Sequence, residues 1–290
     1  GSCFSENIGD KLAYFKLQNC QNPFGILFHP KAIEQFITDV SNTKTFAKDD
    51  LIYVNERYHS FDAHSSLSNV DEHTVLSNLN SQITSTANFL KNTSHVLITL
   101  GTAWVYRFTE KNRIVANCHK IPQKKFQKEI LSIQEITESL ATIVALIKKI
   151  NPKITLLFTV SPIRHLKDGF VENMQSKSHL ISAIHTIIKA EKNTHYFPSF
   201  EIMMDELRDY RFYKEDMIHP NATAINYIWE RFMHTWVSEK ICPILKEIDT
   251  IQKATSHKPF YPKSEAHQTF LKNIALKKEE VKKKLPFVKF

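Results

Sequence analysis

Two short, almost continuous apolar segments stand out along a chain whose other apolar residues recur mostly at helical spacing. Residues 95–100 and 153–160 have the length and composition of buried strands, and each ends at turn-forming residues. Apolar positions with a 3.6-residue period predict helices around them, at 30–40, 72–92, 133–150, 176–191, 200–208 and 221–238. Buried strands that alternate with helices predict a parallel sheet covered on both faces.

Shorter elements complete the expected α/β fold. Residues 1–19 read as a turn followed by a helix, and short strands are expected within 49–58, 113–116 and 195–197. We therefore expect a three-layer α/β/α domain over residues 1–240. Residues 241–290 are expected to form a helical, lysine-rich C-terminal segment.

The same pattern predicts the position of the functional site. Ligands of open parallel sheets bind beyond the carboxyl ends of the strands. Gly101 and Thr102 follow the first buried strand, Ser161 and Pro162 follow the second, and the turn 216–219 precedes the last helix of the domain. We expect these three turns to meet at one edge of the sheet.

Composition excludes several classes of protein. Hydrophobic residues make up 42% of the 290-residue chain, enough for a sizeable core. The four cysteines form no Cys-x-x-Cys pair, which argues against a thiolate zinc site and against a secreted disulfide scaffold. No apolar run is long enough to span a membrane and no signal peptide is visible, so we expect a cytoplasmic protein.

Positive charge is concentrated at the C-terminal end. The chain carries 38 Lys and Arg against 30 Asp and Glu, and six lysines fall within 277–289. Such a tail can contact nucleic acid or acidic lipid. The simpler interpretation is a solvated helix face, because charge runs usually serve that purpose.

The N-terminal string Gly1-Ser2-Cys3-Phe4-Ser5 offers a nucleophile at a predicted strand-to-helix turn. The N-terminus of a helix favours a thiolate, so Cys3 is the first candidate and Ser2 the second. The structural alternative is a small buried thiol, which is the usual environment of a free cysteine.

Asp216-Met217-Ile218-His219 offers the matching base. A carboxylate three residues before a histidine can accept from its Nδ1–H while Nε2 faces a nucleophile. The structural alternative is an aspartate that caps the turn before a helix. Together, Cys3, Asp216 and His219 supply the groups of an acyl-transfer site.

Several strings taken together resemble one family. Gly1–Ser5 differs by one residue from the Gly-Ser-Cys-Phe-Ala motif that gives the GSCFA family its name. Further matches are Asn22-Pro23-Phe24-Gly25, Thr99–Trp104, Asn117-Cys118-His119-Lys120, Ser161–His165, Asp205–Tyr213 and Asp216–Pro220. The resemblance covers about residues 1–240.

The GSCFA family is in turn similar to the SGNH/GDSL hydrolases, which are flavodoxin-like esterases and acyltransferases. This resemblance implies Cys3 at the nucleophile position, Ser2 at the aspartate position, and a strand that precedes residue 1. The superfamily's Gly-x-Asn-Asp block falls on Gly101–Trp104, where its oxyanion asparagine is absent. Candidate oxyanion or substrate-binding residues are Gly25, Gly101, Thr102, Asn117 and His119, with Asn22 as a further possibility.

The resemblance implies hydrolysis or transfer of an acyl group from a small-molecule, glycan or lipid ester, without a cofactor and without nucleic acid. One alternative is a non-catalytic ligand-binding module on the same fold, and another is a nucleic-acid or membrane-surface binder that uses the basic tail. A metal site formed by His64, His119, His165 and His219 is disfavoured, because no His-x-x-x-His spacing supports it. Residues 208–211 are expected to form a buried polar network that supports the 216–219 turn, and the alternative is a role in binding an anionic substrate.

Overall fold

The computed structural model describes residues 1–290, which divide into two compact units. The first unit contains Gly1–Glu6 and Cys20–Ala224, and the second contains Asn7–Asn19 and Ile225–Phe290. This division differs from the sequence-based boundary at residue 240, because an N-terminal segment and the last helix before 240 group with the C-terminal helices. The two units are described separately.

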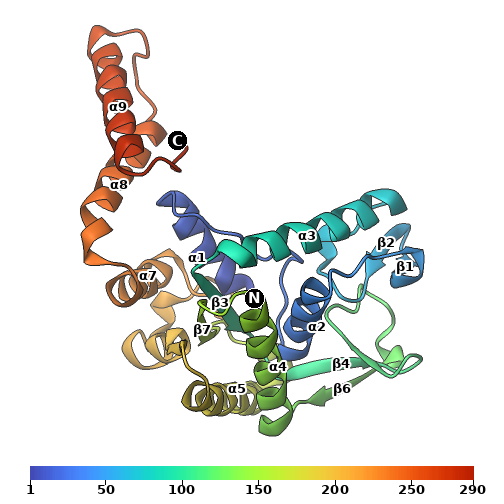
Figure 1. Ribbon diagram of the computed structural model, residues 1–290. Helices are drawn as coiled ribbons and strands as arrows, with labels where there is room; N and C mark the ends of the chain where they lie inside the picture. Colours follow the sequence, from blue (N-terminus) through green and yellow to red (C-terminus); the bar gives the residue numbers. More distant parts are fainter. The chain divides into compact units, whose positions relative to one another are not determined.

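The centre of the first unit is a parallel sheet with the strand order β3-β7-β8, of which β3 and β7 are labelled in Figure 1. The strands are β3 (His95–Leu100), β7 (Thr155–Val160) and β8 (Thr194–Phe197). Thr99 is opposite Thr159, which is opposite Phe197, so the three carboxyl ends lie at one edge. The predicted α/β fold with a parallel sheet flanked by helices is confirmed.

Helices cover this sheet and contact one another. They are α2 (Pro30–Ser41), α3 (Glu72–Asn92), α4 (Ile133–Ile150), α5 (Phe170–Ala190) and the short α6 (Ser199–Glu201). The crossover helices α4 and α5 pack side by side, and α4 also packs on α2. Ser132 and Glu135 form a capping box at the start of α4, which explains why its boundary could be read from sequence.

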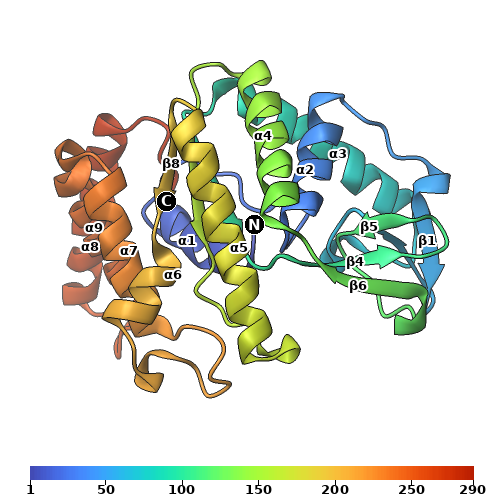
Figure 2. The ribbon, with the colours of Figure 1, turned by 90° about the horizontal axis from the view of Figure 1, so that it is seen from below.

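Two small antiparallel sheets accompany the parallel one. The first pairs β1 (Leu51–Val54) with β2 (Arg57–Ser60), and the second has the order β5-β4-β6 (Figure 2). The strands of the second sheet are β4 (Trp104–Phe108), β5 (Arg113–Val115) and β6 (Phe126–Ile130). Sequence analysis predicted β5 but neither β4 nor β6.

One predicted helix has a different form. Residues 200–208 were expected to be a regular helix, but α6 passes into a π-helical turn, η5 (Ile202–Glu206). Such a turn contains the wider i to i+5 hydrogen bond, seen between Leu207 N–H and the carbonyl of Ile202.

The second unit is helical and has its own core. It contains α8 (Cys242–Ser256), α9 (Glu265–Lys284) and the greater part of α7 (Ala222–Trp236) and of α1 (Cys3–Tyr14). Leu245, Ile248 and Ile251 of α8 are buried with Ile274 and Val281 of α9. No helix of the chain combines the length and apolarity needed to cross a bilayer.

A buried lysine joins the carboxyl ends of two strands of the parallel sheet. Lys177, on α5, is 1% exposed, and its Nζ donates to the carbonyls of Gly101 (2.7 Å) and Ser161 (2.8 Å). Burial lowers the pKa of Lys177 to about 7. Two N–H bonds remain on a neutral amine, so both carbonyls can be satisfied in either protonation state.

Replacing Lys177 with Met keeps most of the volume and removes both donors. We expect the free energy of unfolding to fall by about 2–3 kcal/mol, because two buried carbonyls lose their partners. Urea denaturation checks this, with the exposed Lys189→Met on the same helix as the control. An equal stability of the two variants would contradict the role of Lys177.

Candidate functional site

The N-terminal motif lies against the carboxyl end of β3. Ser2 N–H donates to the carbonyl of Thr99 (3.2 Å), and the carbonyl of Gly1 accepts from Leu27 N–H (3.0 Å). Helix α1 begins at Cys3, as the sequence predicts for a turn that leads into a helix. The motif is therefore held between β3 and the 22–28 loop.

Ser2 and Cys3 have different environments. Ser2 is 1% exposed, and its Oγ accepts from Phe4 N–H (3.3 Å) in the manner of an N-cap. Cys3 is half-buried. Burial raises the pKa of the Cys3 thiol, and the negative charge of Glu6 raises it further. At neutral pH the thiol is therefore protonated and needs a base before it can attack.

The 216–219 turn supplies a positioned imidazole. Asp216 Oδ1 accepts from the main-chain N–H groups of Ile218 (2.8 Å) and His219 (2.9 Å). Asp216 Oδ2 lies 2.7 Å from His219 Nδ1. The aspartate thus caps the turn and orients the histidine at once, which combines the structural and the functional interpretations of this motif.

Hydrogen bonds to Asp216 determine its ionisation and the tautomer of His219. The hydrogen bonds from the two main-chain N–H groups, together with that from the His219 ring, lower the pKa of Asp216 to about 2. A carboxylate with a lowered pKa stays ionised above that value, so Asp216 is an acceptor throughout the neutral range. An acceptor at Nδ1 fixes the tautomer in which Nε2 is unprotonated and can take a proton.

Cys3 and His219 line the same hollow, which has a volume of about 250 Å³. The remaining lining comes from Ser2, Phe28, residues 163–167 and Ile218. The hollow lies at the edge where the carboxyl ends of β3 and β7 meet, as predicted from the topology. A larger depression over residues 261–264 is formed by one surface turn and contains no acid–base pair.

The predicted main-chain donors after β3 already have acceptors. Gly101 N–H donates to the carbonyl of Phe28 (2.7 Å), and Thr102 N–H shares this acceptor (3.2 Å). Thr102 Oγ1 pairs with Ser176 Oγ (3.0 Å) and accepts from Trp104 N–H (3.0 Å). In this conformation neither residue offers a donor to a substrate, so their role is to fix the end of β3.

Gly25 has a conformational role. Its φ is +71°, and a Cβ there would lie 2.5 Å from the Cβ of His64. Its N–H donates to the carbonyl of Asn22 (2.7 Å), and the turn is closed by His64 N–H donating to Phe24. Gly25 is not among the residues that line the hollow.

Asn117 and His119 also lie outside the lining of the hollow. Asn117 Oδ1 accepts from His119 N–H (2.9 Å), and His119 Nε2 lies 2.7 Å from the carbonyl of Ser60. Burial lowers the pKa of His119 to about 4, and its ring packs on that of His59 at 4.6 Å. This pair therefore stabilises the loop after β5 and does not approach Cys3 through the hollow.

Three residues of the site were not singled out by sequence analysis as site residues. Arg164 and Lys167 line the hollow, and so does His165, which the sequence had suggested only as part of a disfavoured metal site. Burial, together with the nearby charge of Lys177, lowers the pKa of His165 to about 3. His165 is therefore a neutral imidazole at neutral pH. The only sequence signal was the match of Ser161–His165 to the family motif.

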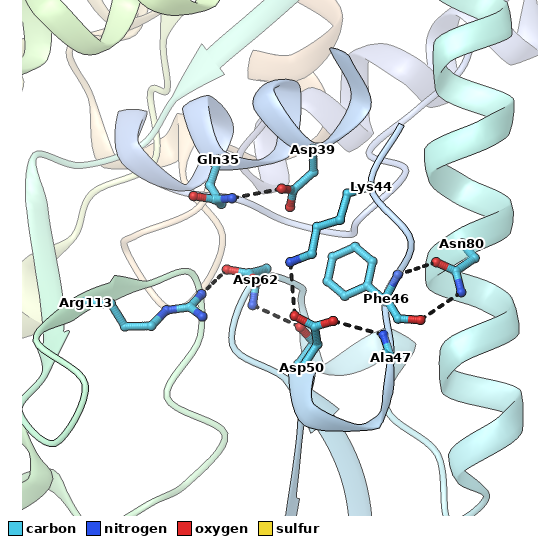
Figure 3. A network of polar contacts seen from close by, with 10 residues as sticks. Gln35, Asp39, Lys44, Phe46, Ala47, Asp50, Asp62, Asn80 and Arg113 are labelled. Atoms are coloured by element: carbon cyan, nitrogen blue, oxygen red, sulfur yellow. Dashed lines mark hydrogen bonds and ion pairs between the residues drawn. The ribbon is translucent and has the colours of Figure 1, made fainter. Parts of the chain in front are cut away.

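A separate polar network lies around Lys44 (Figure 3). Lys44 is paired with Asp50 (3.2 Å), and Arg113 is paired with Asp62. Burial raises the pKa of Asp39 to about 6, and its Oδ1 accepts from Gln35 (2.9 Å). Two of the three carboxylates of this network, Asp50 and Asp62, are each paired with a cation, which is typical of a structural network.

The lysines of the C-terminal tail lie within the second unit, partly in ion pairs. Lys284 contacts Glu247 at 2.7 Å, and Lys282 contacts Glu279 at 2.8 Å. The Nζ of Lys278 lies 5.5 Å from the ring centre of Phe290. These contacts are those of a solvated helix face that packs on α8.

Comparison with known families gives two matches. The sequence model of the GSCFA family matches residues 1–232, and that of the GSCFA domain protein, C-terminal domain, matches residues 248–290. Comparison with curated proteins and with solved structures finds no match.

Replacing Glu6 with Gln should speed alkylation of Cys3 by iodoacetamide at pH 7. Glu6 raises the thiol pKa, so removing its charge lowers that pKa and increases the thiolate fraction, giving a severalfold rise. Mass spectrometry of the Cys3 peptide over time measures the rate. The alkylation rates of Cys3 in the two proteins should become equal at a pH above both thiol pKa values. The surface variant Glu138→Gln should match the wild type, and an unchanged rate in Glu6→Gln would contradict the assigned cause.

Proposed function

Because this chain belongs to the GSCFA family and its nucleophile and base candidates share one hollow, we propose that it is an acyl-transfer enzyme related to the SGNH/GDSL hydrolases. It hydrolyses esters or thioesters, or passes their acyl groups to an acceptor. The observation that supports this most is that Cys3 lines the hollow together with His219, whose Nδ1 is held by Asp216.

In the proposed reaction, His219 Nε2 takes the proton of the Cys3 thiol as the sulfur attacks the acyl carbonyl. The new S–C bond gives a tetrahedral oxyanion. Its collapse breaks the bond to the leaving group, which takes the proton from the imidazolium. Water or an acceptor hydroxyl then attacks the acyl-enzyme, His219 again carries the proton, and the thiol is restored. Asp216 stabilises the imidazolium in both half-reactions.

Cys3 is preferred over Ser2 as the nucleophile for a physical reason. The Ser2 hydroxyl is buried and accepts a main-chain N–H, so attack would require the loss of an N-cap. The raised pKa of Cys3 supports a base-assisted thiol over a preformed thiolate–imidazolium pair. A base-assisted thiol is consistent with the proposed role of His219, which takes the thiol proton.

The oxyanion requires a donor, because Gly101 and Thr102 donate elsewhere and the superfamily asparagine is absent. His165 fits this requirement. It lines the hollow, it is kept neutral by burial, and a neutral imidazole carries one N–H. Neutral histidine is an effective electrophilic donor, since it stabilises the oxyanion without giving up its proton.

Incubation with 4-nitrophenyl acetate should acetylate Cys3, and Cys3→Ala should lose both the adduct and the turnover. His219→Ala should slow acylation by about 10²–10⁴-fold, because general-base assistance is lost. Release of nitrophenolate and mass spectrometry of the Cys3 peptide measure the two quantities. Cys20→Ala, which removes an exposed thiol, should behave like the wild type.

Two results would contradict this assignment. Turnover that survives in Cys3→Ala would move the nucleophile to another residue. Saturable binding of acyl compounds without any adduct would instead support a non-catalytic binding module on the same fold.

Replacing His165 with Ala should lower kcat for acyl transfer about 10²-fold, in line with the loss of one oxyanion donor. Alkylation of Cys3 by iodoacetamide should keep its rate, because that displacement develops no oxyanion. His165→Asn, which retains an amide donor, should recover part of the activity. A parallel loss of alkylation and acylation would indicate that His165 only supports the fold.

A further inference from the structure

The hollow beside Cys3 has an unbalanced charge. Arg164 and Lys167 line it, whereas no Asp or Glu does. Three carboxylates lie close along the chain but outside the lining: Asp168 is paired with Lys128, Asp216 holds the His219 ring, and Glu6 acts on the Cys3 thiol. A partly enclosed site lined by two cations and by no carboxylate favours an anion.

Arg164 is the better positioned of the two cations. Its guanidinium carbon lies 4.4 Å from the ring centre of Tyr213 and 5.2 Å from that of Tyr210. Its Nη1 donates to the Tyr210 hydroxyl at 3.4 Å. Stacking on two aromatic rings fixes the side chain of an arginine before any ligand binds, which lowers the entropic cost of binding.

Arg164 differs from Arg107 and Arg113 in the kind of partner that its side chain has. Arg107 is paired with Glu129, and Arg113 is paired with Asp62, whereas the side-chain partners of Arg164 are tyrosines. A half-buried guanidinium without a carboxylate partner keeps its capacity for a bidentate contact with an oxyanion.

The same residue is linked to the proposed base. Arg164 N–H donates to the carbonyl of Ile218 (3.3 Å), the residue before His219. The loop that carries Arg164 and the turn that carries His219 are therefore joined by their main chains. A group bound at Arg164 lies in the same hollow as the nucleophile and the base.

We propose that the acyl substrate carries an anionic group, a carboxylate or a phosphate, and that Arg164 binds this group while Lys167 adds a second positive charge. This inference rests on the proposed acyl-transfer function. It narrows the substrate class to acidic acyl esters or thioesters, such as a half-ester of a dicarboxylic acid or an acyl group carried on a phosphorylated alcohol or thiol.

The charge preference can be measured without turnover, by comparing iodoacetate with iodoacetamide as reagents for Cys3. The two reagents are close in size and differ by one negative charge, and in each the thiolate sulfur displaces iodide. At Cys3, the alkylation rate with iodoacetate divided by that with iodoacetamide should exceed the same ratio at Cys20. Cys20 is an exposed thiol of the same molecule. Arg164→Gln should lower the Cys3 ratio about tenfold, the loss expected for one charge-assisted contact.

Two variants serve as controls. Arg164→Lys should keep most of the preference because it keeps the charge. Arg211→Gln removes a cation whose side chain is 75% exposed, and should leave the ratio unchanged. Equal ratios at Cys3 and Cys20 in the wild-type protein would overturn the proposal, as would a preference that survives in Arg164→Gln. Failure of both reagents to reach Cys3 would overturn it as well.

Protection of wild-type Cys3 from iodoacetamide separates the two kinds of anion and requires no variant. Inorganic phosphate or acetate should slow alkylation of Cys3 relative to chloride at equal ionic strength, and the more protective anion identifies the group. Equal rates in all three salts would count against the site.

Acetylation of Cys3 by 4-nitrophenyl acetate is measured on the same protein. Absence of the acetyl adduct with a normal reagent ratio would refute acyl transfer alone, whereas an adduct without any charge preference would refute the anion site alone.

Discussion

The parallel pairing of β3 with β7 is the constraint on which the candidate site depends. Because Leu100 is opposite Val160, the chain leaves both strands at the same edge. Ser2 attaches to that edge through the carbonyl of Thr99, and the 163–167 segment starts from it. Lys177 holds the first carbonyl beyond each strand. A slip of one residue in this register would separate the nucleophile from the loop that carries Arg164 and His165.

The 216–219 turn adds the base with little dependence on the rest of the fold. One carboxylate oxygen of Asp216 accepts both main-chain donors of the turn, and the other holds the imidazole. The same side chain therefore closes the turn and orients the ring. Met217, at φ +56°, is held in a left-handed conformation by this closure. Main-chain pairing of Arg164 with Ile218 then joins the turn to the sheet edge.

What could be read from the sequence was local. The helix over 133–150 has its capping box within four residues, and the Asp-x-x-His pair needs only one turn, so both were predicted correctly as structure. β4 and β6 stabilise each other by pairing, which no single segment displays. Lys177 reads as an ordinary helix-surface lysine, since its burial depends on two carbonyls from distant strands. The contact of Gly101 was hidden for the same reason, because its N–H donates to the carbonyl of Phe28, which is distant in sequence.

The charges around Cys3 explain why a cation and a neutral histidine both belong in the proposed site. Burial already holds the thiol in its protonated form, and Glu6 adds to this. An anionic substrate would disfavour the thiolate still more unless a positive charge accompanied it. A guanidinium fixed on two tyrosine rings can offset that charge without competing for the proton, because it does not titrate in the neutral range. His165 then has to be neutral, since a second cation there would take the electrostatic role of Arg164 and remove the weakly acidic donor that an oxyanion needs. The tasks of the three residues therefore differ: the guanidinium of Arg164 stays charged, burial keeps His165 neutral, and Asp216 orients His219.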